Sequence, residues 1–254
     1  MMKIDLKGIN ILLTGASRGI GFAIGKLLLE AGATVALHYK TNGKNLERLL
    51  KGNKNFKGKV FQADLENLEE TEKLFFKAIK ELGRIDVLVN NAGIAIDSSI
   101  DYDNKKWLGD WEKTLKVNLT SLALLCKLAV NHFLKVGGGR IINISSRAAF
   151  RGDTSDYLAY AASKGGIVSL TRSIARGFGK NNIKAFLIAP GFVRTDMANE
   201  FIEKYGEKIA LDDIALPELT EPENIAPFVV FLSSGLADHA TGGTFDINAA
   251  SYVH

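Results

Sequence analysis

The chain has 254 residues, of which 46% are hydrophobic and 24% are charged, and it contains a single cysteine. This apolar content excludes a disordered chain and is enough for one domain with a sizeable core. No stretch approaches the ~18 consecutive apolar residues of a membrane span, the N-terminus lacks a secretory signal pattern, and one cysteine cannot form an internal disulfide. We therefore expect a cytoplasmic protein that has no contact with a membrane.

The net charge of +4 comes from one segment. Residues 40–59 hold seven lysines and arginines against one glutamate, a local charge of +6, so the rest of the chain carries −2. Such a local patch is not the broad basic surface typical of nucleic-acid-binding proteins, and we expect no nucleic-acid partner. The four histidines are scattered and have no partner cysteines, so we expect no metal site.

Apolar strands and amphipathic helices alternate along the whole chain. Strands are predicted over residues 9–15, 34–39, 59–64, 86–91, 141–146, 184–190 and 243–248. Helices are predicted over residues 19–31, 43–51, 67–82, 105–135, 157–179 and 222–234. The alternation predicts an α/β fold with a doubly wound parallel sheet, three-layer α/β/α, formed by a single domain over residues 1–254. In such a sheet, ligands bind at the carboxyl ends of the strands.

A glycine-rich turn separates the first strand from the first helix. It reads Thr14-Gly15-Ala16-Ser17-Arg18-Gly19-Ile20-Gly21. Glycines at such a turn let the backbone approach a pyrophosphate, which then rests on the N–H groups of the helix N-terminus. A turn that merely packs closely is the alternative, but the place between strand and helix favours dinucleotide binding, and no Gly-Lys-Ser/Thr follows to make a P-loop.

Five motifs in this order resemble the short-chain dehydrogenase/reductase family, single-domain type. They are TGxxxGIG at 14–21, NNAG at 90–93, Asn118, Tyr160-x-x-x-Lys164, and Pro190-Gly191 before Thr195. They span nearly the whole chain, and within the family the pattern is similar to that of the 3-oxoacyl-[acyl-carrier-protein] reductases. The resemblance implies a Rossmann fold and an oxidoreductase that transfers hydride between a nicotinamide cofactor and a ketone or secondary alcohol.

The end of the second strand indicates which nicotinamide cofactor binds. NAD-dependent enzymes usually carry an acid about 20 residues after the loop, which bonds the ribose 2′-hydroxyl. Tyr39 occupies that place, and Lys40 and Arg18 would attract a 2′-phosphate, so we expect NADP(H) rather than NAD(H). The resemblance implies that Asp64 caps the adenine amino group, and the alternative is a helix N-cap. By resemblance, the full set of cofactor contacts is Gly15, Ser17, Arg18, Gly19, Ile20, Tyr39, Lys40, Asp64, Leu65, Asn91, Ala92, Gly93, Tyr160, Lys164, Pro190, Gly191, Val193 and Thr195.

A tyrosine and a lysine one helical turn apart form the predicted catalytic pair. Two such pairs occur, and we prefer Tyr160 with Lys164 over Tyr102 with Lys106 because the former follows a strand that ends in serines. A nearby ammonium group, together with the positively charged nicotinamide of the oxidised complex, is expected to lower the pKa of the tyrosine, which is about 10 in water. By resemblance, Tyr160 is the general acid/base, Lys164 also holds the nicotinamide ribose, and Asn118 helps to hold a water–lysine proton relay.

Two adjacent serines compete for the role of binding the substrate carbonyl. Ser146 lies 14 residues before Tyr160, and Ser145 lies one residue further away. Neighbouring side chains of a strand point to opposite sides, so only one of the two serines can face the site. Ser146 is nearer to the spacing of the family, and we assign it the catalytic role.

The substrate is indicated less directly than the reaction. Residues 196–220 are expected to form the substrate lid. An acidic acyl carrier protein would need a basic docking surface, which Arg147, Arg151, Arg172 and Arg176 could supply. Gly137-Gly138, however, stand where those reductases often carry a basic residue. We therefore prefer a small ketone or sugar-like carbonyl to an acyl-carrier substrate.

The alternative class of function is a non-catalytic NADP-binding regulator or scaffold. It is disfavoured because asparagine, serine, tyrosine and lysine are all present at the catalytic positions. The resemblance further implies a homotetramer, with interfaces formed by the helices at 105–135 and 157–179 and by the C-terminal strand. The chain departs from the family at Asn248-Ala249-Ala250, where glycine is usual, which leaves the C-terminal contacts open.

Overall fold

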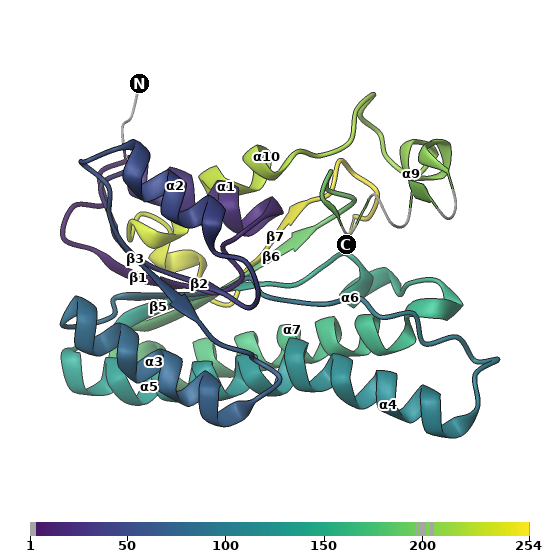
Figure 1. Ribbon diagram of the computed structural model, residues 1–254, viewed down its shortest axis with the longest axis horizontal. Helices are drawn as coiled ribbons and strands as arrows, with labels where there is room; N and C mark the ends of the chain where they lie inside the picture. The colour runs from purple at the N-terminus through teal and green to yellow at the C-terminus, as the bar shows by residue number, and fades with distance from the viewer. Residues whose placement is uncertain (1–3, 197, 199–201, 204–205, 254) are drawn as a thin grey trace.

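A parallel sheet forms the centre of the computed structural model, which describes residues 4–196, 198, 202–203 and 206–253 (Figure 1). In these residues the sheet has seven strands in the order β3-β2-β1-β4-β5-β6-β7. The chain therefore winds outward from β1 to β3 and then from β4 to β7 on the other side, as predicted for a doubly wound sheet. The strands are β1 (Asn10–Leu13), β2 (Thr34–Tyr39), β3 (Lys57–Gln62), β4 (Val87–Asn90), β5 (Gly139–Ile144), β6 (Ile183–Pro190) and β7 (Thr244–Ile247).

Helices cover both faces of the sheet, which confirms the predicted three layers (Figure 1). One face carries α1 (Gly19–Glu30), α2 (Lys44–Gly52) and α10 (Pro222–Ser233). The opposite face carries α3 (Leu68–Leu82), α4 (Asn104–Leu115), α5 (Ser121–Val136) and α7 (Leu158–Phe178).

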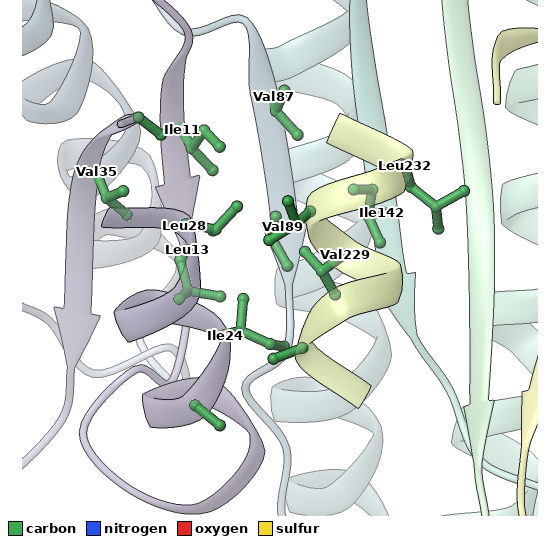
Figure 2. Packing of buried hydrophobic residues seen from close by; sticks show 14 of the residues in the cluster. Ile11, Leu13, Ile24, Leu28, Val35, Val87, Val89, Ile142, Val229 and Leu232 are labelled. Carbon is green, nitrogen blue, oxygen red and sulfur yellow. The ribbon is translucent and has the colours of Figure 1, made fainter. Parts of the chain in front are cut away.

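Two hydrophobic cores lie between these layers because successive strand residues point to opposite faces. In β1, Ile11 and Leu13 face one core and Leu12 faces the other. Figure 2 shows the first core, where Leu28 of α1 and Val229 of α10 pack with the β1 side chains. All these side chains are fully buried, so well-packed cores support the carboxyl edge of the sheet.

The predicted strands and helices are confirmed with shifts of a few residues at their ends, but the helix predicted over 105–135 is not one regular helix. A π-helical turn at Lys116–Thr120 joins α4 to α5. The continuous helical stretch Asn104–Val136 contains a window with a mean hydropathy of 1.4. By length and composition alone, this stretch could span a membrane. In the fold 56% of that window is buried.

Short helices were not predicted. They include α6 (Ala148–Arg151), which follows β5, and α9 (Glu207–Asp212), which lies in the predicted lid. Single-turn 3-10 helices occupy Ser155–Tyr157, Gly179–Asn181 and Asp238–Ala240. Residues 197, 199–201 and 204–205 of the predicted lid lie outside the described residues.

Candidate active site

A cavity of about 690 Å³ opens at the carboxyl edge of the sheet. Its walls come from the segments that follow β1, β4, β5 and β6, together with the start of α7. Strands β1 and β4 are neighbours, and the chain continues from β1 toward β2 on one side and from β4 toward β5 on the other. The cavity therefore lies at the switch point where doubly wound folds bind their ligands. The structure thus brings together segments that are far apart in the sequence.

The turn after β1 is shaped as a cradle that only glycine permits. Gly15 has a φ of 66°, and a Cβ there would lie 2.8 Å from the Cα of Ala92. A Cβ on Gly21 would lie 2.0 Å from the carbonyl oxygen of Gly15. Gly19 also has positive φ, at 51°, and its missing Cβ leaves room for Thr195, whose Cγ2 would be 3.0 Å away. The loops after β1 and β6 therefore approach each other closely.

The N-terminus of α1 is open to an anionic ligand. Arg18 is the N-cap residue and makes no side-chain cap hydrogen bond, and the first turn holds no acidic residue. The free N–H groups and the positive end of the helix dipole suit a phosphate group. The cradle and this helix end fit the pyrophosphate of a dinucleotide.

His38 holds the glycine turn from below, and this role was missed in the sequence. Its Nδ1 accepts a hydrogen bond from the Gly15 N–H at 3.1 Å, and its Nε2 lies 3.0 Å from the carbonyl oxygen of Ala63. These contacts require the neutral ring with its proton on Nε2, and burial lowers the pKa of His38 accordingly. The available signal was a histidine near the end of the largely apolar strand 34–39.

The two cations predicted to attract a 2′-phosphate are both exposed and paired. Arg18 Nη1 lies 2.8 Å from Oδ2 of Asp196, and Lys40 Nζ lies 2.8 Å from Oδ2 of Asp64. Burial raises the pKa of Asp64, but the hydrogen bond and charge of Lys40 outweigh it, so the pKa lies below its usual value. The alternative role of Asp64 as a helix cap is wrong, because the N-cap of α3 is Asn67. Tyr39 ends β2, and Leu65 is buried.

The segment after β4 is tied to the glycine turn. The backbone N–H groups of Asn91 and Ala92 donate to Oγ1 of Thr14 at 3.0 and 3.1 Å. The Asn91 amide donates to the carbonyl oxygens of Thr14 and Gly15 at 3.1 and 3.0 Å. Gly93 follows at the cavity wall. The predicted Asn91, Ala92 and Gly93 therefore lie beside the cradle, in contact with the β1 loop.

Ser146, Tyr160 and Ser145 all line the cavity, but the hydroxyl of Ser145 is engaged by the backbone of α7. The Ser146 hydroxyl is hydrogen-bonded to Tyr160. The buried Ser145 Oγ donates instead to the backbone oxygen of Lys164 at 3.0 Å. The alternative tyrosine, Tyr102, is absent from the described cavity lining, and its ring lies 3.5 Å from Lys106 Nζ. The geometry therefore favours Ser146 and Tyr160 among the candidates.

Lys164 lies beside Tyr160 at the floor of the cavity. Its side chain is 4% exposed, and Nζ donates to the carbonyl oxygen of Ile144 at 3.1 Å and lies 5.5 Å from the centre of the Tyr160 ring. Burial lowers the pKa of Lys164 to about 8. Burial also raises the pKa of Tyr160 to about 12, although the bond with Ser146 opposes it. Burial thus dominates the pKa of Tyr160 in the protein without a cofactor, and the predicted lowering by Lys164 together with an oxidised nicotinamide stays a prediction.

The π-helical turn places Asn118 in the interior of the site. Its amide oxygen accepts from the Ile94 N–H at 2.8 Å, and its amide nitrogen donates to the Ile94 carbonyl at 2.8 Å and to Ser163 Oγ at 3.1 Å. A Cβ on Gly93 would lie 3.4 Å from both Asn118 Oδ1 and Lys164 Nζ. The absence of that Cβ leaves the two polar groups facing a common space.

The segment after β6 closes the cavity on the side of the glycine turn. The Gly191 N–H donates to Ile247 at 3.0 Å, and Pro190 accepts from the Arg147 N–H at 2.9 Å. Val193 forms a bridge with Thr220, and Thr195 Oγ1 accepts from the Ala198 N–H at 3.4 Å. Ile20 of α1 also lines the cavity. Ser17 lies in the cradle turn between Gly15 and Gly19.

Comparison with known proteins agrees with this arrangement. A family model described as enoyl-(acyl carrier protein) reductase matches residues 15–249. The chain is 34% identical to a 3-oxoacyl-[acyl-carrier-protein] reductase of Aquifex aeolicus, over 99% of this chain and 100% of that protein. It is 33% identical to the protein of the same name from Thermotoga maritima, over 98% and 99% of the two chains. The chain belongs to the short-chain dehydrogenase/reductase family.

Solved members of the short-chain dehydrogenase/reductase family share the fold over the full chain. One is a provisionally assigned NAD(P)-dependent gluconate 5-dehydrogenase from Beutenbergia cavernae, solved with NADP bound at low occupancy. It superimposes with a TM-score of 0.90 at 29% identity, over 98% of this chain and 99% of that one. A dehydrogenase/reductase from Sinorhizobium meliloti gives a TM-score of 0.88 at 28% identity, over 99% and 98% of the chains. The chain is thus an NAD(P)-dependent oxidoreductase that acts on carbonyl or alcohol groups, as predicted.

This short-chain dehydrogenase/reductase departs from the family pattern at its C-terminal segment. Ala249 and Ala250 have φ values of 51° and 59°, in the left-handed region where glycine is favoured. The Ala249 carbonyl accepts from the Ala215 N–H at 2.8 Å, which ties this strained turn to the predicted lid. The alanines thus adopt the backbone conformation that glycine would adopt at lower cost.

Proposed function

We propose that this enzyme is an NADPH-dependent reductase of a small ketone, with Tyr160 as general acid/base. Residues 1–254 then form one catalytic domain in the cytoplasm, with a substrate lid around 196–220. The observation that carries the proposal is that Ser146, Tyr160 and Lys164 line one cavity, with Ile20 of α1 on its wall and Asn118 beside Gly93 of the same wall.

Each of these side chains has a role that its position supports. Tyr160 is fully protonated at neutral pH, since its pKa lies near 12, and can donate its proton to the carbonyl oxygen. Ser146 shares a hydrogen bond with Tyr160 and can bind the same oxygen. Lys164 supplies a positive charge beside the phenol, and Asn118 holds the Ile94 segment next to it. A bound nicotinamide supplies the hydride.

The charges around the ribose end favour NADPH. Tyr39 stands at the position of the usual acid, Arg18 is the N-cap residue of α1, and Lys40 directly follows β2. Both cations form exposed ion pairs, with Asp196 and Asp64, and exposed pairs are weak. A 2′-phosphate could therefore take the place of these carboxylates. The Beutenbergia cavernae relative has NADP bound.

A small ketone is favoured over an acyl-carrier substrate, although the curated relatives carry the latter in their names. Two of the four arginines considered for docking, Arg147 and Arg151, are engaged by Asp213 at the cavity. Gly137 ends α5 in a left-handed conformation at φ 88°, and Gly138 has a φ of 127°. The local turn therefore requires glycine where a docking cation would stand.

The proposal is tested by titrating the protein with NADPH and NADH, followed by fluorescence, in parallel with Tyr160→Phe. We expect NADPH to bind at least about tenfold more tightly than NADH in both proteins, because of the 2′-phosphate contacts. Oxidation of NADPH on adding small ketones should fall by about 10³-fold or more in the variant. Equal binding of the cofactors would overturn the NADPH assignment. Binding without turnover in the parent would favour the non-catalytic regulator.

A further inference from the structure

Arg147 lies directly after Ser146 and lines the same cavity, and its charge has no part in the proposed reaction. The residue is 9% exposed. Its guanidinium carbon is 4.8 Å from the centre of the Phe192 ring, and Nη1 is 2.5 Å from Oδ2 of Asp213. A buried cation is therefore held, by a ring face and one carboxylate, next to the place where the substrate carbonyl binds.

The hydrogen-bonding capacity of this guanidinium is not used up among the described residues. Nη1 is buried and lies 2.5 Å from Oδ2 of Asp213, without the geometry of a well-formed hydrogen bond. A guanidinium has five N–H donors, so this single contact leaves donors open to a second, better-aligned acceptor. The Asp213 carboxylate is also shared, since Arg151 Nη1 donates to its two oxygens at 2.9 and 2.8 Å. Two guanidinium groups therefore face one carboxylate.

We propose that Arg147 determines substrate specificity by binding a carboxylate of the substrate, so that the enzyme acts on small oxo acids. The inference rests on the proposed function, because it places the reacting carbonyl at Ser146 and Tyr160. The planar guanidinium matches a carboxylate and can bind it through two N–H groups, and the Phe192 ring fixes its plane. Asp153 and Asp212 line the same cavity and would repel a phosphate dianion more strongly than a monoanion.

The same wall disfavours a long apolar substrate. Arg147, Arg151, Asp153, Asp212 and Asp213 all line the cavity around the predicted substrate side. An acyl chain lying there would exclude water from these charges and give them no partner in return. A compact molecule with a carboxylate at one end and a ketone at the other could instead pair its own charge with Arg147.

The experiment compares oxo acids with their methyl esters, which differ mainly in the negative charge. Calorimetric titrations use 3-oxobutanoate, 4-oxopentanoate and 5-oxohexanoate with the corresponding esters, with and without NADP⁺, which cannot reduce them. We expect at least one acid to bind about tenfold or more tightly than its ester, as for a charge-assisted contact. Equal affinities, or no binding of any acid up to about 10 mM, would overturn the proposal.

Variants assign the preference to Arg147. Arg147→Gln should abolish the preference for the acid, whereas Arg84→Gln, at the opposite end of the sheet beside Asp86, should retain it. Asp213→Asn keeps the Arg147 side chain but removes its internal counter-charge. It should tighten binding of the acid by about threefold to tenfold and leave the ester unchanged. If Arg147→Gln does not fold, this second variant decides, and weaker binding of the acid would contradict the proposal.

A failure of the proposed function gives a different result. Suppose that the acids bind in an Arg147-dependent way but no NADPH is oxidised. The carboxylate site then stands, and the reductase assignment fails. If esters and acids are both reduced equally well, the reductase assignment stands and Arg147 has no role in selection.

Discussion

Lys164 places an ammonium group where folding alone would not favour one. The side chain is 4% exposed, and burial lowers its pKa from 10.5 to about 8. At neutral pH the group is still charged, so the folded protein bears the cost of desolvating it. Its position beside Tyr160 and below Gly93 explains why a cation is held there, because the charge faces the reacting groups.

Lys164→Met is predicted to stabilise the free protein at neutral pH while removing activity. Between pH 8 and 10.5 the unfolded chain binds the lysine proton and the folded chain does not, so the parent gains stability as pH rises through this window. Below pH 8 the full cost is present. The pKa difference corresponds to about 3 kcal/mol, and loss of the bond to Ile144 reduces the expected gain to about 2 kcal/mol.

Urea unfolding of parent and Lys164→Met at pH 6.5 and pH 10 measures this difference. The advantage of the variant should be large at the lower pH and nearly gone at the higher one. The Tyr160 contribution is common to both proteins, so it cancels. A variant that is less stable than the parent at pH 6.5 would show that the ammonium group is well solvated.

The π-helical turn at Lys116–Thr120 joins α4 to α5 and brings Asn118 to the site. Turns of this kind are rare and occur mostly at functional positions. Here the turn buries Asn118 fully, so that its amide can bind both backbone groups of Ile94. The segment that carries Gly93 is thereby fixed beside Lys164.

Asn118→Ala is predicted to reduce kcat at least about tenfold. It should also lower the free energy of unfolding by about 1–3 kcal/mol, because the N–H and carbonyl groups of Ile94 lose their partner. Asn67→Ala is the matched control. It removes the cap of α3 and should cost about 1 kcal/mol with kcat unchanged. Steady-state kinetics and urea unfolding are measured on both. Equal kcat values would mean that Asn118 only supports the fold.

The layers and the glycine turn could be predicted from sequence because each follows from local signals, namely the alternation of apolar segments and glycines between a strand and a helix. Strand alternation predicted that only one of Ser145 and Ser146 faces the site, and the spacing to Tyr160 favoured Ser146. The π-helical turn could not be predicted, since the apolar stripe of residues 105–135 is that of one helix. The roles of His38 and of the Arg147–Asp213 pair depend on segments that meet only in the folded chain.

The turn at Ala249 and Ala250 gives a prediction about backbone strain. Both alanines lie in the left-handed region, which costs roughly 1–2 kcal/mol for a residue with a Cβ. Ala249→Gly should therefore raise stability by about 0.5–1 kcal/mol, after allowing for the greater freedom of glycine in the unfolded chain. Ala123→Gly, within α5, should lower stability by about 1 kcal/mol. Chemical unfolding of the two variants would show opposite signs. Destabilisation by Ala249→Gly would contradict the argument.

At the scale of the whole molecule, helices α4, α5 and α7 form a layer with an incompletely buried outer face. Only 56% of the most apolar window of Asn104–Val136 is buried in one chain. Leu108 of α4 and Leu158 of α7 are 49% and 40% exposed. Apolar residues exposed on adjacent helices suit an interface between copies, in agreement with the homotetramer implied by the family resemblance.

Light scattering is predicted to give a particle of about four times the chain mass of 27.6 kDa. Leu158→Glu should reduce that mass, because a charge would be buried in the interface without a partner. Phe76→Glu, at a side chain 52% exposed on α3, is the matched control and should leave it unchanged. A parent of 27.6 kDa would exclude assembly, and a Leu158→Glu particle of unchanged mass would place the interface on other elements. Since Leu158 begins the helix that carries Tyr160 and Lys164, dissociation should also lower kcat if assembly holds this helix in place.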